Sequence, residues 1–118
     1  MRCLLLICSD ETVITGVSEA EMQASMVPWN AYTEELRKKG KMLVGEILEL
    51  TASASTVRLG AGGITSNGPF AETKEQMGGF FVIEVESMKE ATEWTARMPN
   101  IPDGSSVEVR RIMEQDRG

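Results

Sequence analysis

Two helix-start motifs divide the chain and restrict how it can fold. Ser18 precedes Glu21 by three residues, and Ser87 precedes Glu90 by the same spacing. Both are capping boxes, in which serine and glutamate side chains satisfy backbone N–H groups at a helix start. We therefore expect one helix to begin at Glu19 and a second to begin after Ser87.

Extended segments surround both predicted helices. Residues 2–8 are almost continuously apolar, which indicates a central strand covered on both faces. Further strands are expected over 42–50, with Gly45 as a bulge, and over 80–86 and 107–112. Each helix lies between strands, and the strands outnumber the helical crossovers. The order predicts an α+β fold, namely a ferredoxin-like sandwich with a mostly antiparallel sheet and two helices on one face.

The first helix carries one apolar stripe, formed by Met22, Met26, Trp29 and Leu36, which predicts a core-facing surface. Gly40 follows a basic last turn and is the expected C-cap. Pro28 lies inside this pattern and lacks an N–H, so we expect it to kink the helix or split it in two.

Residues 53–59 and 64–65 predict a small hairpin inserted into the domain, joined by the glycine-rich stretch 60–63. An Asn-Gly turn follows at Asn67. The polar segment 71–77 is expected to end at Gly78-Gly79, before the strand over 80–86.

The chain contains no histidine, which excludes several kinds of chemistry. A Ser-His-Asp triad, a Cys-His dyad and a histidine-ligated metal cannot be built from this sequence. We expect neither a metal nor a cofactor. The 18 acidic and 12 basic residues give a net charge of −6, which argues against binding to nucleic acid. The length of 118 residues fits a single domain over 1–118.

Two cysteines bear on the compartment. If residues 2–8 form a strand, Cys3 and Cys8 lie on opposite faces and roughly 16 Å apart, too far for a disulfide. Free thiols fit a reducing compartment, and no segment has the pattern of a signal peptide or a membrane span. These features predict a cytoplasmic protein without membrane contact.

Residues 56–75 carry the densest set of polar and glycine residues. Arg58 could clamp an anionic ligand with its guanidinium group, or pair with a glutamate across strands. Glu72 and Glu75 could share a proton on one helical turn, or be ordinary solvated acids. A ligand rim and a solvated loop are both compatible with this composition.

The segment Asn67-Gly68-Pro69-Phe70-Ala71-Glu72-Thr73-Lys74-Glu75, followed by Gly78-Gly79-Phe80-Phe81, closely resembles the DGPF-domain proteins of the YCII-related superfamily. The resemblance implies a dimeric α/β barrel of ferredoxin-like units, with a cleft near the dimer interface lined by Gly68, Pro69 and Phe70. It also implies a His-Asp pair, but Asn67 replaces the motif aspartate, and Trp29 or Asn30 lies where the family histidine is expected.

The favoured function is therefore a dimeric small-molecule-binding domain without turnover. Its ligand, a small anion, would be held by Arg58, Asn67, Gly68, Pro69, Phe70 and Phe81. One alternative is an enzyme of lactone or dehalogenation chemistry, as in one branch of the family, with Glu72 or Glu75 as its base. The other is a partner protein of a sigma factor, because DGPF proteins are often encoded beside such factors.

Overall fold

The computed structural model describes residues 1–13, 17–60, 65–67, 76–99 and 105–115. The two α-helices each lie between strands along the chain, as the sequence predicts. The elements are β1 (Arg2–Ser9), the 3-10 helix η1 (Glu11–Val13), α1 (Glu19–Lys38), β2 (Met42–Ile47), the 3-10 helix η2 (Thr51–Ser53), β3 (Ser55–Val57), β4 (Thr65–Asn67), β5 (Gln76–Glu84), α2 (Met88–Ala96) and β6 (Ser106–Arg111).

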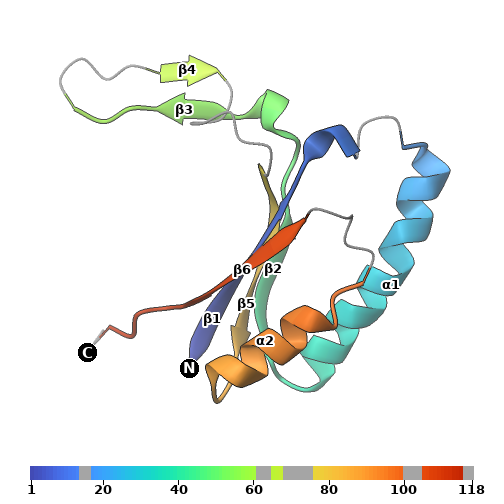
Figure 1. Cartoon of the computed structure of the whole chain (residues 1–118), viewed down its shortest axis with the longest axis vertical. Coiled ribbons are helices and arrows are strands. Elements are labelled where there is room, and N and C mark those ends of the chain that lie inside the picture. Colours follow the sequence, from blue (N-terminus) through green and yellow to red (C-terminus); the bar gives the residue numbers. More distant parts are fainter. Residues whose placement is uncertain (14–16, 61–64, 68–75, 100–104, 116–118) are drawn as a thin grey trace.

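Four strands form an antiparallel sheet in the order β2-β5-β1-β6. Both helices lie on one side of this sheet (Figure 1). The strand order and the single helical layer are those of a ferredoxin-like sandwich, so the predicted α+β class is confirmed. β1 pairs with β5 on one side and β6 on the other, as expected for its continuous apolar run.

The core lies between the sheet and the two helices. Cys3 and Leu5 of β1, Ile83 of β5 and Leu36 of α1 are fully buried. Burying an aliphatic side chain of this size contributes about 1.5–3 kcal/mol to stability. Cys3 is buried and Cys8 is partly buried, and no disulfide joins them, as the sequence predicts.

Both helices begin where their caps predict. Ser18 Oγ accepts a hydrogen bond from Glu21 N at 3.1 Å, and Ser87 Oγ accepts one from Glu90 N at the same distance. Gly40 follows α1 with φ of +67°, as expected beside a C-cap. Of the two outcomes expected for Pro28, a kink or a split, the structure excludes the split, because α1 continues through Pro28 without a break. One missing N–H removes a single helical bond, and the buried residues of the last turns hold the segment in place.

Two strand boundaries and the position of one irregularity differ from the sequence-based prediction. β2 ends at Ile47, and its irregularity falls between Met42 and Val44 rather than at Gly45. β5 begins at Gln76 and includes Gly78 and Gly79, which were expected to precede it. The reason is steric, since a Cβ on Gly79 would lie 3.0 Å from the Glu46 carbonyl oxygen. Glycine there permits close backbone approach rather than ending a segment.

The predicted inserted hairpin is present. β3 and β4 pair with each other in a separate two-stranded sheet, with Ser55 opposite Asn67. The hairpin projects to the side of the main sheet that faces away from the helices (Figure 1). The radius of gyration is 16.3 Å, against about 13.5 Å for a compact chain of this length.

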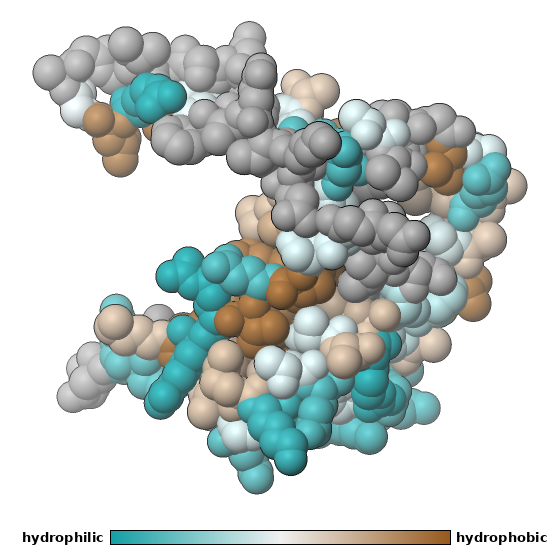
Figure 2. All heavy atoms as spheres, viewed as in Figure 1, coloured by the Kyte–Doolittle hydropathy of each residue, from teal (hydrophilic) through white to brown (hydrophobic). Residues whose placement is uncertain are grey.

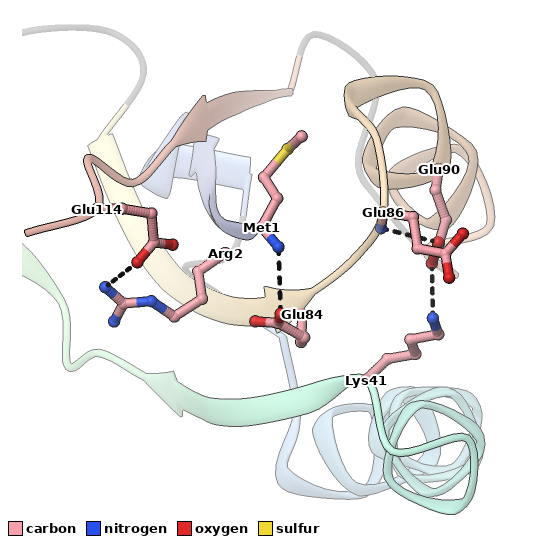
Figure 3. A network of polar contacts seen from close by, with 7 residues as sticks. All are labelled: Met1, Arg2, Lys41, Glu84, Glu86, Glu90 and Glu114. Atoms are coloured by element: carbon pink, nitrogen blue, oxygen red, sulfur yellow. Dashed lines mark hydrogen bonds and ion pairs between the residues drawn. The ribbon is translucent and has the colours of Figure 1, made fainter.

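Several ion pairs lie at the end of the sheet opposite to the hairpin (Figure 3). The Met1 amino group lies 3.1 Å from Glu84, and Lys41 Nζ lies 3.1 Å from Glu90 Oε2. Partial burial raises the pKa of Glu90, but hydrogen bonds from Glu86 N–H and Lys41 outweigh it and hold the pKa below its usual range. No α-helix in the described part of the chain has the length and apolar character of a membrane span.

Candidate functional site

A cleft of about 720 Å³ opens between the first half of α1 and the sheet. We call it the α1 cleft. A volume of several hundred cubic ångströms with a mostly apolar lining is typical of small-molecule sites. The apolar side chains that line it include Ile7, Met22, Met26, Trp29, Met42, Ile47 and Phe81, and the polar ones include Ser9, Glu21, Ser25, Asn30 and Thr33.

Glycines form part of the cleft floor. Gly45, Gly78 and Gly79 lie in adjacent strands and line the cleft without side chains. A Cβ on Gly45 would lie 2.7 Å from Phe81 Cδ1 and 2.9 Å from Met42 Cε. The absence of a side chain at Gly45 therefore leaves room for the Phe81 ring, which packs against Trp29 of α1.

Aromatic rings connect the cleft to the core. The ring centroids of Trp29 and Phe81 are 6.3 Å apart, with an interplanar angle of 16°. Tyr32 contacts Phe81 and Trp94 at centroid distances of 5.9 and 6.1 Å. Such pairs add stabilisation beyond the area that they bury. The wall on which a ligand would lie is therefore held rigidly by the core.

Tyr32 is an anchor rather than a proton donor. Its hydroxyl donates a hydrogen bond to the Trp94 backbone oxygen at 2.7 Å, which ties α1 to α2. Burial raises the pKa of Tyr32 to about 12. The hydroxyl thus keeps its proton at neutral pH and is already engaged.

The cleft has little charge. Glu21 projects from the helix face that lines it, together with Met22 and Ser25. Glu46 lines the cleft at β2, but Gly45 and Ile47 face the helices, so the pleat directs the Glu46 side chain to the other face of the sheet. Among the described lining residues there is no lysine or arginine. The described part of the cleft therefore offers no cation to an anionic ligand.

A small polar network lies near the root of the hairpin. The Glu11 carboxylate accepts hydrogen bonds from Thr51 N at 2.8 Å and from Thr51 Oγ1 at 2.7 Å. Gln76 Nε2 lies 3.4 Å from the same hydroxyl oxygen. These contacts join η1, η2 and the start of β5, so they fix the end of the sheet from which the hairpin leaves.

The residues predicted to bind a ligand have different positions. Phe81 lies in the cleft wall and is 8% exposed. Arg58 directly follows β3 on the hairpin, is exposed, and is not among the cleft-lining residues. Asn67 ends β4. The remaining predicted residues, Gly68, Pro69, Phe70, Glu72 and Glu75, lie outside the described residues.

No separate signal in the sequence indicates the helix side of the cleft. Met22, Met26 and Trp29 were predicted to face the core, and their helical spacing was the evidence. In the structure this stripe continues from core to cleft, since Leu36 is buried whereas Met22 is 44% exposed. The glycines at 45, 78 and 79 are the sequence feature that could have indicated a part of the sheet surface without side chains.

The fold and the cleft define an α+β protein with a ferredoxin-like sheet and a ligand-sized cleft beneath its first helix. A family model of the YCII-related domain matches residues 1–116. The chain is also 36% identical over 114 residues to an uncharacterized protein of Rhizobium meliloti (strain 1021), covering 95% of this chain and 92% of that protein. The chain belongs to the YCII-related family, as its motifs indicate.

Proposed function

We propose that this protein binds a small, mainly apolar molecule in the α1 cleft. The observation that carries the proposal is the cleft itself, about 720 Å³ in volume, with the stacked Trp29 and Phe81 rings in its wall. Serine, asparagine and threonine side chains on α1 supply the few polar contacts that orient a ligand in such a site. A cytoplasmic location belongs to this proposal.

Binding without turnover is the activity that the residues support best. The chain has no histidine, and Asn67 lies where the family motif has aspartate, so the His-Asp pair proposed for relatives has no counterpart here. Arg58 lies on the hairpin, so an anion held by Arg58 would occupy a place other than the described cleft.

A homodimer through the open face of the sheet is part of the proposal. Leu4 and Leu6 of β1 and Phe80 and Val82 of β5 alternate with the core-facing side chains and form the centre of this face. Helices cover the other face, whereas these four side chains are only partly buried, and apolar surface in contact with water is unfavourable. A second copy, related by two-fold symmetry, would cover it.

Tryptophan fluorescence tests ligand binding directly. The chain has two tryptophans, and Trp94→Phe leaves Trp29 in the cleft wall as the sole indole. We expect 2-phenylethanol to change Trp29 emission saturably, and 3-phenylpropanoate to bind at least about tenfold more weakly for lack of a cationic partner.

A blocking substitution provides the control. Ser25→Phe would fill the cleft and should abolish the response, whereas Gln23→Phe, on the exposed side of the same helix, should preserve it. Equal responses in the two variants, or no saturable response in the parent protein, would show that the cleft is not the binding site.

A further inference from the structure

The hairpin formed by β3 and β4 forms a sheet separate from the main one and exposes apolar side chains. Its strands pair only with each other among the described residues. Val57 is 58% exposed and Leu59, which follows β3, is 94% exposed. An isolated two-stranded hairpin is marginally stable in water at best. The hairpin therefore needs a surface against which its apolar side chains can pack.

The hairpin and the open sheet face lie on the same side of the molecule. In Figure 1 the hairpin extends away from the helices, and Figure 2 shows hydrophobic surface over the sheet below it. A protein bound to the open face of the sheet would therefore also lie beside the hairpin. The position of the hairpin makes the two surfaces continuous.

The rim of the open face suits a second copy of the same chain. One row of paired residues runs across the four strands as Glu46, Phe80, Leu6 and Glu108. A glutamate therefore lies at each end of this row, on the two edge strands. The neighbouring row ends in Arg110, which pairs with Leu4. An isologous contact must be complementary to itself, and a rim that carries both signs around an apolar centre meets that requirement.

The surface area supports the same occupant. The accessible surface is 8311 Å², whereas a compact chain of this mass exposes about 6,300 Å². The excess of about 2,000 Å² is larger than the ~800 Å² that each partner contributes to an interface of standard size. The exposed area of the chain is therefore sufficient for an interface of standard size.

We propose that the hairpin is a dimerisation clasp, which packs Val57 and Leu59 against a second copy of the chain. This inference rests on the proposed dimer, and two-fold symmetry gives each copy one clasp. The partner then covers Val57 and Leu59, which the described part of their own chain leaves exposed.

The test compares the dimer dissociation constants of three variants by sedimentation equilibrium. Leu59→Glu removes a clasp contact at a side chain that is almost wholly exposed in one copy, so folding of the monomer should be unaffected. We expect it to weaken the dimer by about tenfold or more. Val27→Glu is the matched control, because Val27 is 68% exposed on α1, away from both surfaces, and its dimer should match wild type.

A third variant, Leu6→Glu, changes a residue on the open face of the sheet. It shows whether a negative result concerns the clasp alone or the dimer as a whole. If Leu6→Glu dissociates the protein while Leu59→Glu behaves like Val27→Glu, the clasp is wrong and the face-to-face dimer stands. A wild-type protein that is monomeric throughout the concentration range overturns both. As a second readout, amide exchange in β3 should slow as protein concentration rises, and exchange independent of concentration would contradict the clasp.

Discussion

The indole ring of Trp29 stacks on the phenyl ring of Phe81, with centroids 6.3 Å apart. This contact joins α1 to β5 at the boundary between the hydrophobic core and the α1 cleft. Because Phe81 also contacts Tyr32 on its core side, a change at the sheet floor should reach the cleft wall through these rings.

Gly45→Ala should displace the stacked rings. The new methyl group would lie 2.7 Å from Phe81 Cδ1, and overpacking of this kind costs about 1–3 kcal/mol. Chemical denaturation in the Trp94→Phe background, with Trp29 emission as the signal, measures both the stability and the ring environment. Gly78→Ala is the control, since its Cβ would meet nothing within 4 Å, so that variant should be as stable as wild type. Equal stabilities for the two variants would contradict the packing argument.

The tyrosinate titration should have its midpoint near pH 12. Tyr32 is the sole tyrosine, so absorbance at the tyrosinate band reports this residue alone. Burial raises its pKa to about 12, against about 10 in an unfolded chain. The folded state therefore holds the proton more tightly, and this contribution to stability is complete below pH 10 and lost as the pH rises through 12. A midpoint near 10 in folded protein would contradict it.

Tyr32→Phe should lower stability at neutral pH. The substitution removes the hydrogen bond that Tyr32 donates to the Trp94 carbonyl at 2.7 Å and leaves that buried oxygen without this partner. Loss of such a bond costs about 1–3 kcal/mol. Urea unfolding measures the change, and above pH 10 the variant should lack the alkaline loss attributed to Tyr32. A variant as stable as wild type at pH 7 would show that the bond contributes nothing.

Arg58 offers a test of the predicted anion site. If its guanidinium clamps a carboxylate, a screen of small carboxylates should raise the melting temperature of wild type but not of Arg58→Ala. Lys38→Ala, an exposed cation on α1, controls for the change in net charge. A shift that persists in Arg58→Ala would assign anion binding to other residues.

Local signals allowed much of the fold to be predicted. The serine caps at 18 and 87 act within their own turns, so both helix starts followed from adjacent residues. Gly78 and Gly79 were misplaced because the reason for Gly79 is distant in sequence. Its Cβ position faces the Glu46 backbone of a neighbouring strand, and no local pattern reports such an approach.

The cleft was harder to predict than the core. A helical stripe of Met22, Met26 and Trp29 indicates which face of α1 turns inward, but not how closely the sheet approaches it. That distance depends on Gly45 and on the Phe81 ring, which come from two other strands. Arg58 is likewise separated from Phe81 because the hairpin leaves the main sheet. The direction in which the hairpin leaves depends on tertiary structure.

The central position of β1 has a consequence for the order of folding. This apolar strand precedes both of its partners in the chain, which are residues 76–84 and 106–111. During translation its leucines have no sheet to join until most of the chain has left the ribosome. Pairings between such distant segments form slowly, because a large loop must close first. The nascent chain thus carries an unpaired hydrophobic segment that a chaperone could occupy until β5 arrives.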